Sequence, residues 1–246
     1  MLLLIAALAL MGQRDPVLVP EISQHDVQVR QGFTGTELLL YGAVLPPAGA
    51  APEDYAIIVV LKGPSEPIRM REKERFAGVW INADSSDLRS VPSFFAVASS
   101  APIAEIVDDK TAAIFEFGTD YIQLSPTGTI DPEAVARFTA GLVDLKRRQG
   151  LYQEDIGGVR IVEGVLYQAR ITLPSNVTTG MYTAETFAVA RGRVLASATT
   201  EVDVRKVGME RFVEDSANNY GLAYGLVAVI LSVGMGWGAG RLFARL

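Results

Sequence analysis

Residues 220–240 read YGLAYGLVAVILSVGMGWGAG, and this stretch decides how the rest of the chain is organised. It contains no charged residue, and Ser232 is its only strongly polar side chain. An α-helix rises ~1.5 Å per residue, so about twenty residues cover the ~30 Å hydrocarbon core of a bilayer. A buried helix of a soluble protein would normally show a polar face, and this stretch shows none. The sequence therefore predicts a transmembrane helix over residues 220–240.

Charges on either side of this helix predict its orientation. Arg241 and Arg245 follow it, whereas Glu214 and Asp215 precede it. Because excess positive charge marks the cytoplasmic side of a membrane, we expect residues 241–246 to form a cytoplasmic tail. The predicted location is the bacterial cytoplasmic (inner) membrane, crossed once, with the bulk of the chain in the periplasm.

The first residues, MLLLIAALALMG (1–12), form an apolar run that is too short to span a bilayer. Its length fits the apolar part of a secretory signal peptide, and Ala7 and Ala9 have the small-residue spacing of a cleavage site. The usual preceding basic residue is missing. Two outcomes therefore stay open, cleavage after Ala9 or retention as an uncleaved anchor.

Composition excludes several classes of function. The formal net charge is −6, which argues against nucleic acid as a partner because nucleic-acid binding needs a basic surface. The chain has no cysteine, so disulfides, thiolate catalysis and cysteine metal sites are excluded. A periplasmic domain of this composition must be stabilised by packing alone.

Residues 25–207 carry mainly strand patterns, separated by Gly- and Pro-rich turns. YAIIVVLKG (55–63) is continuously apolar, as in a strand buried on both faces, whereas VLYQARITLP (165–174) alternates. We therefore predict an immunoglobulin-like β-sandwich, followed by a juxtamembrane linker over residues 208–219. The two strand-rich halves either complete one sandwich or form two. We favour one, because pieces of two or three strands are rarely stable alone.

A helical insertion is predicted at about residues 101–150, between the two strand-rich halves. Its clearest helix is DPEAVARFTAGLVDLKRRQG (131–150), with Asp131 as the N-cap, Pro132 in the first turn and Gly150 after the last. An apolar stripe formed by Val135, Phe138, Leu142 and Leu145 should pack against the sandwich. The alternative is a helix that binds a partner.

Six segments resemble an alphaproteobacterial transmembrane protein family: FTGTELLLYGAV, REKERFAGVWIN, VPSFFAVASSAP, ITLPSNVTTGMYTAETF, VRKVGMERFVEDSANN and YGLAYGLVAVI. The resemblance spans about residues 25–241. It implies a signal sequence, a periplasmic β domain and one C-terminal transmembrane helix, and it brings no established activity or catalytic residue. Members are associated with sulfite-exporter-type (TauE/SafE-type) permeases, which implies an accessory role.

The residues themselves favour no enzyme, and we expect no catalytic residue, metal or cofactor. His25 is the only histidine and lies near the start of the predicted domain, as a surface or strand-edge residue would. The adjacent carboxylates Asp108-Asp109 and Glu154-Asp155 usually point apart and stay solvated.

Two features are candidates for binding. If residues 68–76 are extended, Arg69, Arg71, Lys73 and Arg75 share one strand face that would attract an anion, lipid headgroups or an acidic partner. The alternative is a solvated edge hairpin whose charges prevent sheet-to-sheet aggregation. In the transmembrane helix, glycines recur at small-xxx-small spacing, which favours helix–helix packing, though a passive anchor also tolerates them. These glycines are Gly221, Gly225, Gly234, Gly236, Gly238 and Gly240.

The predicted function is that of a membrane-anchored periplasmic accessory or binding protein, an auxiliary subunit of a transporter such as a sulfite-exporter-type permease. Its partners would be the lipid bilayer and an integral membrane protein or a second copy of the chain. The alternative is a periplasmic anion- or ligand-sensing module that uses the basic face Arg69–Arg75.

Overall fold

The computed structural model describes residues 15–29, 34–47, 54–127, 131–207, 213 and 216–243. The chain divides into two compact units. The first consists of Met1–Val27 and Thr34–Val204, and the second consists of Gln28–Phe33 and Arg205–Leu246. Strands and the helices between them build the first unit, and the helix α6 (Gly221–Phe243) dominates the second. The predicted fold class, mainly β with one C-terminal transmembrane helix, is confirmed. The predicted signal segment 1–12 and most of the linker 208–219 lie outside the described residues.

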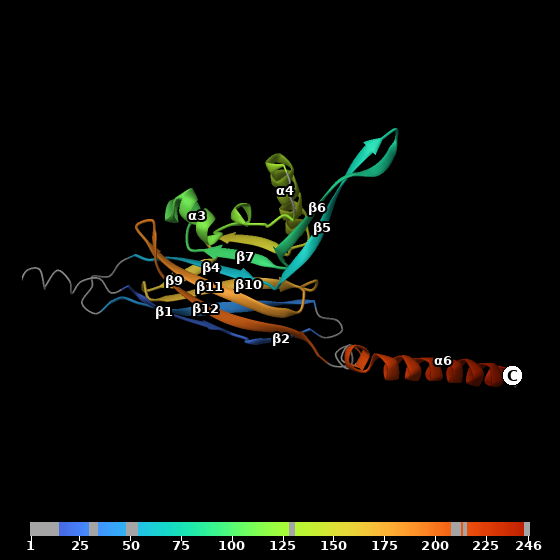
Figure 1. The fold of residues 1–246 in the computed structure, drawn as a ribbon. Helices are drawn as coiled ribbons and strands as arrows, with labels where there is room; N and C mark the ends of the chain where they lie inside the picture. Colours follow the sequence, from blue (N-terminus) through green and yellow to red (C-terminus); the bar gives the residue numbers. More distant parts are fainter. Residues whose placement is uncertain are drawn as a thin grey trace, which may run out of the picture. The chain divides into compact units, whose positions relative to one another are not determined.

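The first sheet of the strand-rich unit is antiparallel throughout (Figure 1). In spatial order, its strands are β1 (Val17–Ile22), β3 (Gly35–Leu45), β10 (Leu166–Pro174) and β9 (Val159–Val162). The predicted alternation of β10 is confirmed from Tyr167 to Leu173, where every second residue is buried.

The second sheet packs against the first as a separate layer (Figure 1). Its strands, in spatial order, are β2 (Asp26–Val29), β12 (Arg193–Lys206), β11 (Gly180–Ala190), β4 (Ala56–Lys62), β7 (Phe95–Ser99) and β8 (Tyr152–Ile156). The central strand β4 is buried along Ile57–Leu61, so the prediction of a strand covered on both faces is confirmed. Strands from the two halves of the chain pair directly, β3 with β10 and β4 with β11.

The strand order matches that of immunoglobulin domains in most positions. The order β1-β3-β10-β9 corresponds to A-B-E-D, and β12-β11-β4-β7 corresponds to G-F-C-C′. Near the start of β11, the Tyr182 hydroxyl donates to the Thr178 carbonyl oxygen at 2.7 Å, as the tyrosine of a tyrosine corner does. However, β8 adds to β7 in parallel, which is not part of that pattern. The immunoglobulin-like assignment therefore stays a prediction.

A helical crossover joins β7 to β8, as a parallel connection requires. It contains α2 (Ile103–Ile106), α3 (Asp109–Phe115), the short 3₁₀ helix η1 (Thr119–Tyr121) and α4 (Pro132–Arg148). Phe115 and Phe117 pack on Phe187 of β11, with ring centroids 5.4 and 4.9 Å apart, and this contact fixes α3 on the second sheet. The predicted start of α4 is confirmed, because Asp131 caps it and Pro132 opens it.

The third sheet is a hairpin of β5 (Ser65–Phe76) and β6 (Val79–Pro92), which runs away from the sandwich beside α4 (Figure 1). At its base, Leu88 and Val91 are buried with Leu142 of α4, and Ile68 and Met70 pack against them. The hairpin is therefore held to α4 by an apolar cluster of its own.

Two details differ from the sequence-based expectations. Strand β1 lies upstream of residue 25, where the predicted domain began, and Pro20 is accommodated because β1 is an edge strand. The predicted packing stripe of α4 is wrong at Leu145, which is exposed. The buried side of α4 is formed by Phe138, Leu142, Val143 and Lys146.

Candidate functional site

The β5–β6 hairpin holds the four cations singled out from the sequence. It turns through Ala77 and Gly78, whose positive φ angles of 48° and 87° suit a two-residue hairpin turn. Both irregularities of its ladder place the extra residue on β6, because Glu72 pairs with Asp84 and Lys73 pairs with Asn82. Strand β5 therefore keeps its alternation from end to end.

This alternation places the four predicted cations on the exposed side of β5. Ile68, Met70 and Glu72, between or beside them, are half-buried. All four cations, Arg69, Arg71, Lys73 and Arg75, are exposed. Their binding role stays a prediction, but the structure places them on one accessible face.

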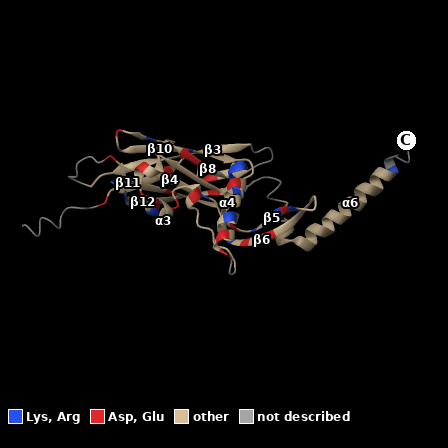
Figure 2. Cartoon of the chain, turned by 90° about the horizontal axis from the view of Figure 1, so that it is seen from above, with Lys and Arg blue, Asp and Glu red and all other residues tan. Residues whose placement is uncertain are grey.

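Most acidic side chains of the hairpin are neutralised by ion pairs. Arg137 of α4 lies 3.0 Å from Glu72 and 3.1 Å from Asp84, so one guanidinium holds both strands. At the base, Asp87 pairs with Arg69 at 3.4 Å, and Glu66 with Lys146 at 3.2 Å. Lys, Arg, Asp and Glu all mark this hairpin in Figure 2.

Three cations and one carboxylate on β5 stand apart from these pairs. Arg71, Lys73, Arg75 and Glu74 have no salt bridge within the residues that the structure describes. Glu74 lies on the opposite face from the three cations because strand residues alternate. The outer half of the hairpin thus presents unbalanced positive charge on one side.

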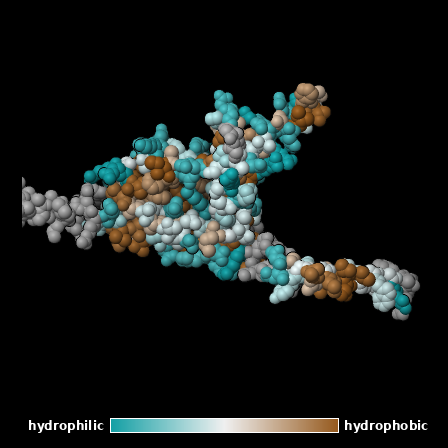
Figure 3. Space-filling model, in the orientation of Figure 1, coloured by the Kyte–Doolittle hydropathy of each residue, from teal (hydrophilic) through white to brown (hydrophobic). Residues whose placement is uncertain are grey.

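The end of the hairpin is apolar, which Figure 3 shows as a brown cap on a mostly teal arm. The exposed fractions are 71% for Phe76, 64% for Val79, 66% for Trp80 and 45% for Ile81. Phe76 pairs with Val79 and Arg75 pairs with Trp80 across the ladder. We call these four apolar residues the hairpin tip.

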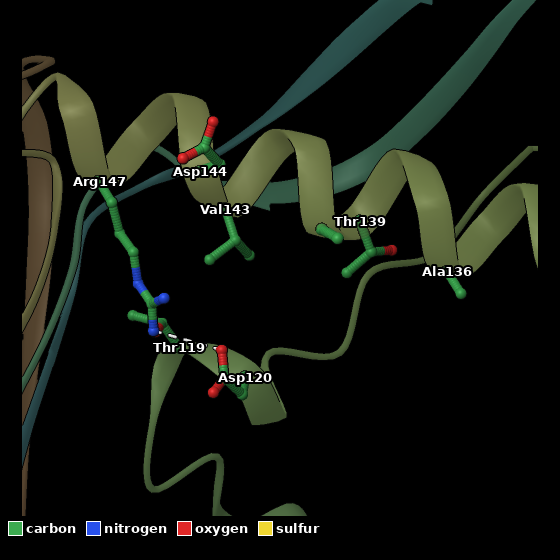
Figure 4. A pocket seen from close by; sticks show the side chains of 8 residues that line it. Thr119, Asp120, Ala136, Thr139, Val143, Asp144 and Arg147 are labelled. Carbon is green, nitrogen blue, oxygen red and sulfur yellow. Dashed lines mark hydrogen bonds and ion pairs between the residues drawn. The ribbon is translucent and has the colours of Figure 1, made fainter.

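A pocket of about 440 Å³ lies between α4 and η1 (Figure 4). Arg147 reaches from α4 to η1, where it donates to the Thr119 hydroxyl and lies 3.2 Å from Asp120. The same guanidinium lies 3.3 Å from Glu154 of β8. These contacts tie α4, η1 and β8 together, so Arg147 and Asp120 of the pocket wall already serve the packing of the crossover.

Glu154 is the most constrained carboxylate of this network. Burial alone would raise its pKa, but hydrogen bonds from the Thr119 hydroxyl and backbone N–H, both 2.5 Å, and the charge of Arg147 hold the pKa below its ordinary value. Glu154 is therefore stabilised as an anion with satisfied partners. In this ionised state, Glu154 links η1 to Arg147 of α4.

The helix α6 is long and apolar enough to cross a membrane over Gly221–Arg241, and none of that span is buried. At about 100° per residue, Gly221, Gly225, Gly236 and Gly240 lie on one face, whereas Gly234 and Gly238 lie on the opposite one. Ala228, Ser232 and Ala239 continue the first face. Leu222 and Val229 also project on this side, so the face is rich in small residues without being made of them alone. We call its seven small residues the small-residue face. The six predicted glycines thus do not form a single surface.

Residues 17–245 match the family model described as "Putative transmembrane protein (Alph_Pro_TM)". The chain belongs to this family. The match includes both the sandwich strands and α6, which confirms the family resemblance inferred from the sequence. A search of curated proteins finds no match to the chain.

Membership in this transmembrane family supports α6 as a membrane-spanning helix. A single apolar helix is weak evidence for a membrane span by itself, but here it falls within the region that defines the transmembrane family. The α6 segment therefore anchors the family's β domain to a membrane. At its end, the Arg241 guanidinium lies 5.4 Å from the Trp237 ring centroid, and aromatic and basic residues are enriched at membrane interfaces.

Sequence reasoning missed the hairpin tip and the Arg147 network. The tip was visible as the apolar run FAGVWI around a turn, a place where polar residues are usual. The pair Glu154-Asp155 was interpreted as solvated, yet Glu154 holds η1. Two further residues considered in the sequence have local contacts. Asp108 caps α3, and His25 pairs with Glu21 at the surface.

Proposed function

We propose that the chain is a non-enzymatic accessory protein of the bacterial inner membrane. In this proposal, α6 crosses the bilayer once, the β domain stands in the periplasm, and α6 docks on an integral membrane partner. A sulfite-exporter-type permease is the partner that the family resemblance suggests. A second copy of the chain is the other partner that the same surface would fit.

The observation that carries the proposal is the composition of the small-residue face of α6. A passive anchor tolerates glycine, although in water glycine costs about 1 kcal/mol relative to alanine in a helix interior. The arrangement of several small residues on one face is what favours a packing role. Small residues let two helix backbones approach closely within a membrane, and Ser232 places a hydroxyl in the middle of this face. Leu231, a larger side chain outside this face, is exposed in the structure, as is the rest of the span.

The proposed orientation has support from charge. Arg241 is the last residue of the span, whereas the segment that precedes the span contains Glu214 and Asp215. A reporter enzyme that works only in the periplasm, fused after Leu246, should therefore be inactive. An active fusion would place the β domain in the cytoplasm and contradict the proposal.

Docking can be tested by cross-linking because the natural chain contains no cysteine. Gly225→Cys or Gly236→Cys, carrying a photoactivated cross-linker, should yield a discrete larger adduct in native membranes, identified by mass spectrometry. Gly234→Cys, on the opposite face, is the matched control and should not. A permease adduct supports the accessory subunit, a homodimer supports self-association, and equal labelling of lipid from both faces contradicts docking altogether.

A second function is favoured by the free cations of β5. Arg71, Lys73 and Arg75 lie exposed on one face without a salt bridge in the described part of the chain, so a periplasmic anion sensor would use them. Binding of inorganic sulfate to the full chain in zwitterionic nanodiscs tests this function. Binding that disappears in the variant with Arg69, Arg71, Lys73 and Arg75 all changed to Gln supports the sensor, and no binding by the natural chain contradicts it.

A further inference from the structure

We propose that the hairpin tip inserts into the interfacial layer of a bilayer that carries anionic headgroups. The tip consists of Phe76, Val79, Trp80 and Ile81, and the cations Arg71, Lys73 and Arg75 stand behind it on β5. The inference rests on the membrane anchorage of the proposed function and not on its protein partner. It gives the β domain a second attachment to lipid, besides α6.

The first argument is the apolar surface itself. Along β5, every second residue is half-buried from Glu66 to Glu72, and beyond that point the strand is fully exposed. The exposed outer end then carries Phe76 and Trp80 at 71% and 66% exposure. Exposed apolar groups at the end of a hairpin invite aggregation unless they bind something. Tryptophan is enriched at membrane interfaces because its ring is amphipathic.

The second argument is charge complementarity. Arg137 neutralises Glu72 and Asp84, and Arg69 neutralises Asp87, so the acids next to the outer half of the hairpin are already paired. Glu74 is the only carboxylate of that half outside these pairs, against the three cations Arg71, Lys73 and Arg75. Anionic headgroups attract such clusters.

The third argument is the spacing between the cations and the tip. At ~3.3 Å per strand residue, Lys73 lies about 10 Å behind Phe76, and Arg75 lies next to it. The headgroup layer of a bilayer is roughly 5–8 Å thick on each side of the hydrocarbon core. With the tip at the base of that layer, Arg75 reaches the phosphates directly and Lys73 reaches them by extending its side chain.

The fourth argument is that the hairpin is held in place. Its base packs on Leu142, and Arg137 bridges its two strands to α4. A tip presented on a fixed arm loses little conformational freedom on binding. A bilayer is also the one surface that is always present beside a chain anchored by α6.

The experiment uses the full chain with Trp237→Phe, which leaves Trp80 as its only tryptophan. The protein is reconstituted, without any other protein, into vesicles of zwitterionic lipid or of zwitterionic lipid mixed with phosphatidylglycerol. In each case, lipids with brominated acyl chains replace ordinary ones. We expect the brominated anionic vesicles to reduce Trp80 emission about twofold, and the zwitterionic vesicles to do so less.

Two variants separate the apolar and the charged contributions. Phe76→Ser with Val79→Ser and Ile81→Ser should abolish the quenching, while Arg71→Gln with Lys73→Gln and Arg75→Gln should reduce it to the level of zwitterionic vesicles. Salt at ~1 M, where the Debye length is ~3 Å, should act like the second variant. Val19→Ser with Leu166→Ser is the matched control, since it removes exposed apolar residues from the first sheet, and it should change nothing. A circular dichroism melt of each variant confirms that the fold is intact.

Unquenched Trp80 in both kinds of vesicle would overturn the proposal. If Trp80 is then shielded from acrylamide in native membranes but not in vesicles, the occupant of the tip is a protein. Equal quenching in both lipids, unaffected by the cation variant, would overturn the role of anionic headgroups. None of these results affects the cross-linking of α6, so the accessory function and the tip proposal fail separately.

Discussion

Lys146 Nζ of α4 lies 3.2 Å from Glu66 Oε1 at the base of the β5–β6 hairpin. Lys146 is 7% exposed and is also 3.5 Å from the Ser93 carbonyl oxygen. A buried ammonium is costly without a counter-charge, so the Lys146 charge favours the position of Glu66 beside α4. This single pair couples the position of the hairpin to the position of the helical crossover.

Removing the carboxylate should therefore be worse than removing the ammonium. Glu66→Gln leaves the Lys146 charge buried without its partner, and we expect it to lower the free energy of unfolding by about 1–3 kcal/mol. Lys146→Met removes the charge and keeps an apolar stem, so it should cost less. Chemical denaturation of the full chain in detergent measures both values. The reverse order would contradict the coupling.

Arg137 should control the motion of the hairpin more than overall stability. Its two ion pairs are partly exposed, so Arg137→Gln should cost no more than about 1 kcal/mol. Hydrogen exchange of backbone amides around Glu72 and Asp84 should nevertheless become faster, because the strands lose their common clamp. Arg148→Gln, which breaks an exposed pair with Asp144 within α4, is the control and should leave this exchange unchanged. Unchanged exchange in both variants would show that packing on Leu142 alone holds the hairpin.

Glu154 should give the crossover an acid-sensitive contact. Its pKa is lowered below the ordinary 4.5, so its contribution to stability is complete above that pH and is lost as the pH falls through the lowered value. Glu154→Gln should cost about 1 kcal/mol at neutral pH, and the difference from the natural chain should shrink below about pH 4. Melting temperatures of both chains from pH 3 to 7 provide the test. A difference that stays constant with pH would contradict the role of the charge.

The two glycine faces of α6 should differ in their effect on association. Gly225→Leu with Gly236→Leu fills the small-residue face and should lower cross-linking to the proposed partner about tenfold, or ~1.4 kcal/mol. Gly234→Leu with Gly238→Leu makes the same chemical change on the opposite face and should have little effect. Because helix propensity changes equally in both variants, only the position of the contact distinguishes them. Equal losses would mean that no single face is used.

Tyr182 should be a stability determinant of the sandwich. Its side chain is fully buried, burial raises its pKa to about 12, and its hydroxyl donates to the Thr178 carbonyl oxygen at 2.7 Å. Tyr182→Phe should lower the free energy of unfolding by about 1 kcal/mol because this hydrogen bond is lost. Tyr41→Phe, at an exposed position, should be neutral in the same denaturation measurement.

Local patterns in the sequence predicted local elements well. The continuous apolar run of β4, the cap and first turn of α4, and the apolar length of α6 are each determined by neighbouring residues. Periodicity and capping act within a few residues, so they can be read without knowledge of the fold.

Features that depend on distant partners were not predictable in this way. Lys146 is buried because Glu66 meets it from eighty positions earlier in the chain, so an apolar stripe pointed instead to its neighbour Leu145. Glu154 has its role only because the crossover brings Thr119 and Arg147 to β8. The edge strand β1 was missed because Pro20 interrupts its pattern and its pairing with β3 is long-range.

Both ladder irregularities of the hairpin lie on β6, and this placement has a consequence for sequence change in the family. Inserting or deleting one residue in β5 after Met70 would turn Arg71, Lys73 and Arg75 toward the opposite side, because strand side chains alternate. Substitutions on the exposed side leave the alternation of side chains along β5 unchanged. Evolution in this arm should therefore proceed by exchange of side chains at constant length, and natural indels should be confined to β6 or to the turn.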